Sequence, residues 1–277
     1  MNGLTILAHS FRQVTGNLGM AIKVSGWLVA IYVIGGAVLM SAMPEWLDAA
    51  MDQNAQGMAD AADFSGGSVG LVLLFTLAAV IFLFWSVSLV AIVWHRYILL
   101  EEIPQGFIPY RKDFRIGRYF WLGLGISVLA ALVVAVVSGI LGVIVGPFFV
   151  NSMEGFAAGQ NTGVVGVSFL MGLVIGTIVA VLYLRMALVL PAVALDERLT
   201  IGQAWRETSG HTGAIIGLAL ALAFINAVVP LVINLAFGEL IWVNLALVGL
   251  YQWFYFMLGI SILSTLYGHI VQKREVY

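Results

Sequence analysis

Four histidines are the side chains in this sequence that best fit metal or haem chemistry. They are His9, His95, His211 and His269, and imidazole nitrogens are common ligands of transition metals. No two of them are three or four residues apart, and none lies deep inside an apolar segment, where a haem between helices would be held. The sequence has no cysteine, which excludes thiolate metal sites and a cysteine nucleophile. We therefore expect hydrogen-bonded histidines near the membrane surface, with no metal and no cofactor.

Acidic side chains give no better indication of catalysis. Every Asp and Glu falls outside the long apolar segments, so none lies where burial would tune it as a general acid or base. The sequence therefore predicts no catalytic residue and no enzyme activity.

The composition of the chain indicates a membrane protein. Apolar residues make up 62% of the 277 residues and charged residues only 9%, whereas about a quarter of a soluble domain is charged. The few basic residues give no argument for nucleic acid binding. We predict an all-α integral membrane protein.

Six apolar windows are each long enough for a helix to cross about 30 Å of hydrocarbon. They cover about 24–43, 70–94, 119–150, 164–184, 213–237 and a last stretch that ends near 269. The third exceeds one crossing, so we expect it to be tilted, broken near Pro147 or partly interfacial. The apolar tail 186–195 contains Pro191, and we predict an interfacial turn there.

The positions of the basic residues predict the orientation. All twelve Lys and Arg lie in the N-terminal segment, in 95–118, in 185–212 or in the C-terminal tail, and the three alternate loops have none. Cytoplasmic loops of membrane proteins are enriched in Lys and Arg. We therefore expect a multi-pass protein with both termini in the cytoplasm.

A repeated block of residues indicates internal symmetry. Residues 11–19 match 205–213 place by place, with an aromatic residue, an arginine and two glycines three apart, and 114–118 is a looser copy. Each block precedes a pair of apolar segments. This predicts one membrane domain, 1–277, built of three pseudo-repeated hairpins at about 1–102, 103–197 and 198–277, related by a pseudo-threefold axis.

Each hairpin is predicted to follow a cytoplasmic amphipathic helix that lies on the membrane. The first of these helices spans Leu4 to Thr15. Residue spacings of three and four place Leu4, Leu7, Phe11 and Val14 on one apolar face of this helix.

Six basic side chains on the predicted cytoplasmic side are candidates for binding anionic lipid head groups or an anionic solute. These residues are Arg12, Arg96, Arg115, Arg185, Arg206 and His269. Each cation near the membrane surface attracts anionic lipid by about 1 kcal/mol. Arg185 lies nearest the membrane interior, where a charge needs a partner or water. We expect it to reach lipid phosphates or to pair with Asp196 or Glu197.

Three asparagines in the last hairpin are the other polar candidates. Asn226 falls near the middle of the fifth span, with Pro230 one turn on, and Asn234 and Asn244 lie toward the opposite end. Asparagines inside a membrane usually bond across to a neighbouring helix. The alternative interpretation is a polar path opened by the proline.

The second half of the chain resembles a known group of proteins. The matching residues are Arg185, Leu190-Pro191-Ala192, Glu197, Ala204-Trp205-Arg206 and Gly210. They are similar to the pattern of bacterial six-span inner-membrane proteins of uncharacterised function, which include the membrane domain associated with glycerophosphodiester phosphodiesterases. The resemblance implies a bacterial inner-membrane module concerned with lipids or envelope upkeep. The phosphodiesterase motif itself is not matched, because Tyr97 follows His95-Arg96 where that enzyme has Gly.

Two functions from different classes follow from these observations. The first is a non-enzymatic membrane protein that binds anionic lipid, or a partner membrane protein, through its basic residues and interfacial helices. The second is a small transporter or channel with a path along the pseudo-threefold axis. A polar cavity along that axis would favour transport.

Overall fold

Six long helices dominate the computed structural model, which describes all residues except 1, 43–65, 107, 111–113, 158–161 and 275–277. They are α2 (Leu18–Ala42), α5 (Gly66–Leu100), α6 (Ile116–Ala157), α7 (Thr162–Met186), α10 (Thr212–Phe237) and α11 (Ile241–Ile270). Each contains an apolar stretch long enough to cross a membrane, and the described part of the chain has no strand. The predicted six spans of a multi-pass membrane protein are confirmed to this extent.

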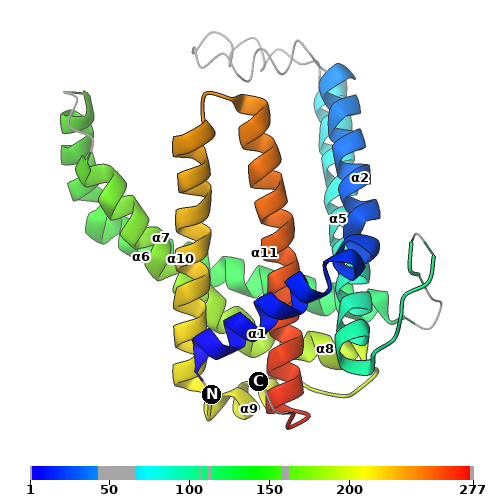
Figure 1. Ribbon diagram of the computed structural model, residues 1–277. Helices are drawn as coiled ribbons and strands as arrows, with labels where there is room; N and C mark the ends of the chain where they lie inside the picture. The colour runs from blue at the N-terminus through cyan, green and yellow to red at the C-terminus, as the bar shows by residue number, and fades with distance from the viewer. Residues whose placement is uncertain (1, 43–65, 107, 111–113, 158–161, 275–277) are drawn as a thin grey trace.

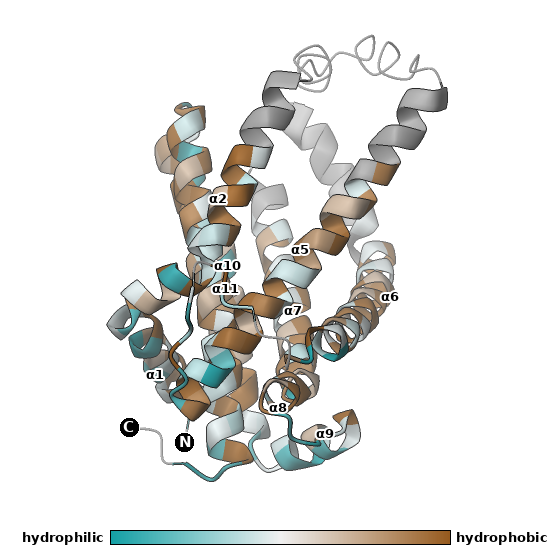
Figure 2. Cartoon of the chain, turned by 90° about the vertical axis from the view of Figure 1, so that its right-hand side faces the viewer, coloured by the Kyte–Doolittle hydropathy of each residue, from teal (hydrophilic) through white to brown (hydrophobic). Residues whose placement is uncertain are grey.

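The long helices pair as three antiparallel hairpins, α2–α5, α6–α7 and α10–α11 (Figure 1). The hairpins meet at the end of the molecule where both chain termini lie, and α6–α7 leans away from the other two. The buried core lies at this end and includes Leu89 to Trp94 of α5 and Met257 and Leu258 of α11. Farther from the termini the hairpins expose apolar side chains such as Val136, Val143 and Leu235. Figure 2 shows polar residues gathered over α1, α9 and the connections near the termini.

Helix α1 (Gly3–Gly16) lies across α10 and α11 at the end with the termini (Figure 1). The Asn2 side chain caps it by accepting a hydrogen bond from the Thr5 N–H at 2.8 Å. A Cβ on Gly3 would lie 2.4 Å from the backbone nitrogen of Leu218, so the two helix backbones touch at a position that only glycine allows.

The predicted helix is therefore present, but the protein covers a largely different face from the apolar one that the spacing identified, and the contact of that apolar face with a membrane stays a prediction. The buried side of α1 is Gly3, Ile6, Ser10 and Val14, whereas Leu4 and Phe11 are 63% and 48% exposed. Small residues allow helices to approach closely. The close backbone contact at Gly3 therefore orients α1 so that the face with its small residues packs on the protein.

Helix α9 (Ile201–Ser209) is the second short helix that carries the repeated block. Thr200 and Gln203 form a capping box, in which each side chain bonds the backbone N–H of the other residue. The buried residues of α9 are Ala204 and Thr208, and the helix packs on α7.

The middle copy of the block does not form a separate surface helix, which corrects the prediction for the second hairpin. Among the described residues from Glu101 to Arg115, none is helical, and the block runs directly into α6. Pro104 and Pro109 lack a backbone N–H, and Gly106 has φ +79, so this segment cannot continue a helix.

The apolar tail after the fourth span is also different from its prediction as an interfacial turn. It forms α8 (Val189–Ala194), all six residues of which are buried against α5, α6 and α11. Pro191 fits because it lies in the first turn, where a backbone N–H has no helical partner. The connection 44–69 between the first two predicted spans, which carries five acidic residues and no Lys or Arg, lies mostly outside the described residues.

Candidate anion-binding face

A buried hydrogen-bond network joins the hairpins where they meet. His95 of α5 is fully buried, and its Nδ1 lies 2.8 Å from Ser264 Oγ of α11. Its Nε2 lies 3.1 Å from the Tyr119 hydroxyl of α6. The neighbouring Trp94 donates from Nε1 to Ser261 Oγ at 2.8 Å, one turn of α11 before Ser264. His95 is therefore hydrogen-bonded as expected, but it lies in the interior and binds three helices together.

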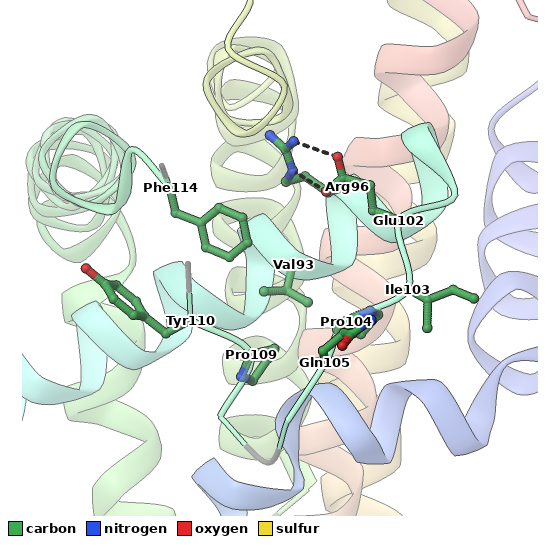
Figure 3. A pocket seen from close by; sticks show the side chains of 9 residues that line it. All are labelled: Val93, Arg96, Glu102, Ile103, Pro104, Gln105, Pro109, Tyr110 and Phe114. Carbon is green, nitrogen blue, oxygen red and sulfur yellow. Dashed lines mark hydrogen bonds and ion pairs between the residues drawn. The ribbon is translucent and has the colours of Figure 1, made fainter. Parts of the chain in front are cut away.

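Arg96 follows this histidine and is held by acidic and backbone oxygens. Its Nε and Nη2 donate to the two carboxylate oxygens of Glu102 at 2.8 and 2.7 Å (Figure 3). Its Nη1 donates to the Ala194 carbonyl of α8 at 2.9 Å and lies 3.7 Å from Asp196. Asp196 also pairs with Arg115 at 2.5 Å. Two of the predicted anion-binding residues are thus bound to acids of the protein itself.

A cavity of about 440 Å³ lies beside the Arg96–Glu102 pair (Figure 3). The Arg96 guanidinium carbon lies 5.7 Å from the centre of the Phe114 ring, which is within range of a cation–π contact. The rest of the lining comes from Val93 and from Ile103, Pro104, Gln105, Pro109 and Tyr110.

Arg185 is the most deeply buried of the predicted basic residues. It is 7% exposed, and its guanidinium carbon lies 4.9 Å from the centre of the Trp205 ring of α9. Its Nη2 donates to Thr212 Oγ1 at 2.5 Å, and its buried Nε has no hydrogen-bond partner among the residues that the structure describes. Arg185 and Arg96 thus both contact an aromatic residue of a repeated block.

The predicted pairing of Arg185 with Asp196 or Glu197 does not occur. Asp196 pairs with Arg115 and Arg96, and Glu197 accepts a hydrogen bond from the Tyr267 hydroxyl. Both acids follow α8, and the burial of α8 against α5 and α11 carries them toward those helices.

The remaining candidates lie on the surface of the same end. Arg206 of α9 is exposed and makes no ion pair with a residue that the structure describes. His269 bonds the Arg274 carbonyl through Nδ1 at 2.9 Å, and its ring centre lies 5.9 Å from that of His211. Arg12 of α1 is exposed and lines a groove.

This groove, of about 440 Å³, lies between α1 and the α10–α11 hairpin. Its walls are apolar or aromatic except for Arg12, and they comprise Leu4, Leu7, Ala8, Phe11, Ile225, Tyr251, Phe254, Tyr255 and Leu258. Phe11 packs edge-to-face on Phe254 with ring centres 5.4 Å apart. Sequence reasoning missed the groove, although the spacing of Leu4, Leu7 and Phe11 had identified the stripe of α1 that lines it.

The three asparagines all belong to the last hairpin. Asn226 Oδ1 accepts a hydrogen bond from the Tyr251 hydroxyl at 3.3 Å, which joins α10 to α11. Asn234 is exposed near the end of α10, and the buried Nδ2 of Asn244 has no hydrogen-bond partner. The structure thus gives Asn226 the bond to a neighbouring helix that such residues usually make.

One sequence pattern was overlooked. Residues 66–70 read Gly-Gly-Ser-Val-Gly and fit the Gly-x-Ser-x-Gly pattern of a hydrolase nucleophile. A nucleophile elbow is a sharp turn between a strand and a helix, whereas these residues form the start of α5. The pattern therefore lacks the structural context that its chemistry requires.

In comparisons with known proteins, no family model, no curated protein and no solved structure matched this chain. The resemblance to six-span bacterial inner-membrane proteins therefore stays a prediction.

Proposed function

We propose that this chain is a non-enzymatic protein of the bacterial inner membrane that binds anionic phospholipid at the end carrying both termini. We further propose that this end faces the cytoplasm. The arginines and lysines of α1, α9 and the adjoining ends of α5, α7 and α11 lie there, and basic residues prefer the cytoplasmic side.

The observation that carries the proposal is the groove beside α1. Its apolar walls match an acyl chain, and Arg12 supplies a positive charge in the same lining. Apolar walls alone give little preference over bulk lipid, because a chain that enters the groove leaves an equally apolar environment. Selectivity must then come from the head group, and one surface cation contributes about 1 kcal/mol, or about fivefold.

The threefold repeat is part of this proposal. The buried positions of α1 and α9 correspond, since Ser10 matches Ala204 and Val14 matches Thr208 in the repeated block. Each of these helices packs on the hairpin that precedes it in cyclic order, α9 on α7 and α1 on α10–α11. Two of the three copies thus follow the order expected of a pseudo-threefold axis, whereas the middle copy has no separate helix among the described residues.

The transport alternative has weaker support. Asn226, which would line the path, bonds Tyr251 within its own hairpin. The other alternative is that the basic end binds a partner protein in place of lipid. The experiment below distinguishes these two kinds of ligand.

The test measures which phospholipids the purified protein retains. The full-length protein is incubated in detergent with equal amounts of phosphatidylglycerol and phosphatidylcholine, and bound lipids are counted by native mass spectrometry. We expect the wild type to prefer phosphatidylglycerol and Arg12→Gln to lose about fivefold of that preference. Arg198→Gln removes the same charge from an exposed position outside the groove and serves as the control.

Equal retention of both lipids by the wild type would refute lipid selectivity and favour a partner protein. Equal losses in Arg12→Gln and Arg198→Gln would show that only net charge matters, and the groove would then have no role.

A further inference from the structure

Arg185 is a buried positive charge with no carboxylate of the described residues paired to it. It is 7% exposed, and it makes no ion pair with any residue that the structure describes. Its Nε is buried and has no hydrogen-bond partner in the part of the chain that the structure describes. A guanidinium stays charged at any physiological pH, and a buried charge is costly unless it is paired and hydrogen-bonded. The position of Arg185 therefore calls for an anion.

The guanidinium is held at the first turn of α10, a helix of 26 residues. Its Nη2 bonds Thr212 Oγ1, on the first residue of that helix. The preceding residue, His211, caps no backbone N–H with its side chain. The first N–H groups of a helix have no helical acceptor and carry partial positive charge. A Cβ on Gly213 would meet nothing within 4 Å, so there is open space beside this turn.

Two further features point to the same place. His211 immediately precedes α10, and its buried Nδ1 has no hydrogen-bond partner among the described residues. The Trp205 ring covers one face of the Arg185 guanidinium at 4.9 Å. An anion must then approach in the guanidinium plane, where the N–H groups point.

The first hairpin shows what an arginine at this position does when an acid is present. Arg96 lies four residues before the end of α5 and Arg185 one residue before the end of α7, and Arg96 binds both oxygens of Glu102, six residues later in the chain. Six residues after Arg185 the chain has Pro191, which offers no acid. Arg185 pairs with no carboxylate among the described residues, so its unpartnered Nε is left for an anion from outside the protein.

We infer that Arg185 and the first turn of α10 bind a phosphate group. Guanidinium binds phosphate through two parallel hydrogen bonds, and helix N-termini bind phosphate through backbone N–H groups. The phosphate belongs to a phospholipid head group or to free phosphate. The inference deepens the proposed function and rests on it for the lipid source, but it concerns a site apart from the groove at Arg12.

The experiment follows the melting temperature of the full-length protein in detergent with inorganic phosphate, with phosphatidic acid, or with phosphatidylcholine. The wild type is expected to be stabilised by one or both phosphate probes beyond the effect of chloride or phosphatidylcholine. Arg185→Gln should lower the apparent affinity for the effective probe by about tenfold or more, as expected for lost hydrogen bonds to a charged group. The control is Arg118→Gln, at an exposed arginine of α6.

Two other variants protect the test against misfolding of Arg185→Gln. Arg185→Lys keeps the positive charge but loses the planar set of guanidinium N–H donors. Thr212→Val removes the hydroxyl that accepts a hydrogen bond from the guanidinium. Both should weaken the phosphate response by less than Arg185→Gln does. A response to inorganic phosphate identifies a free anion, and a response to phosphatidic acid alone identifies a lipid head group. Either result supports the site.

The inference is overturned if neither probe stabilises the wild type, or if the Arg185 variants respond as strongly as the wild type. Its failure is separate from failure of the proposed function. Loss of phosphatidylglycerol preference in Arg12→Gln alongside an unchanged phosphate response in Arg185→Gln would sustain the groove and remove only this site.

Discussion

Replacing Gly3 by alanine tests whether α1 touches α10 as closely as the structure shows. The new Cβ would lie 2.4 Å from Leu218 N and 2.5 Å from the Ala214 carbonyl oxygen, and both of these atoms belong to the backbone of α10. Helix α1 would have to move by about 1 Å to restore ordinary van der Waals contact. Overpacking of this kind costs about 1–3 kcal/mol.

Gly16, in the same helix, provides a matched control. A Cβ there meets nothing within 4 Å, so Gly16→Ala adds the same methyl group without a clash. Alanine is favoured over glycine in a helix by up to about 1 kcal/mol. The two variants should therefore differ in stability by about 1–4 kcal/mol, with Gly3→Ala the less stable.

The assay combines thermal unfolding in detergent with hydrogen exchange of the α1 backbone amides. Gly3→Ala should melt below the wild type and exchange faster in α1, whereas Gly16→Ala should melt at or above the wild type. If the two variants melt together and α1 exchange is unchanged in both, the backbone contact between α1 and α10 is not formed, and the groove beside α1 loses its wall.

Three further experiments test contacts at the meeting point of the hairpins and the cap of α9. His95→Phe keeps a buried ring but loses the hydrogen bond to Tyr119, and it should lower the free energy of unfolding in denaturant by about 2–4 kcal/mol. A double-mutant cycle with Tyr119→Phe should show a coupling energy of about 0.6–1.7 kcal/mol. Additive effects of the two substitutions would contradict the hydrogen bond. Glu102→Gln should lower the melting temperature more than Asp196→Asn does. Glu102→Gln breaks the bidentate pair with the mostly buried Arg96, whereas Asp196→Asn breaks the more exposed pair with Arg115, which is worth about 1 kcal/mol or less. Thr200→Ala should raise hydrogen exchange in α9 by removing a cap worth about 0.5–2 kcal/mol, and unchanged exchange would argue against the capping box.

The site was predicted less completely than the fold. The sequence identified Arg185 as the basic residue that most needs a partner, but the two acids it offered, Asp196 and Glu197, are near Arg185 only along the chain. Packing of α8 brings these acids to Arg96, Arg115 and Tyr267 instead. The groove at α1 was missed because it exists only between two elements more than two hundred residues apart in the sequence.

The sequence by itself determined the class of structure. Six apolar segments of about 20 or more residues and twelve cations confined to alternate loops are local properties, since burial in lipid depends on the hydropathy of each segment alone. Only the tertiary structure decided which face of α1 is buried, that 189–194 is an interior helix, and that Arg185 stands without an acid. These outcomes depend on which helices approach each other and how closely, and residues such as Gly3 set that distance through contacts with distant parts of the chain.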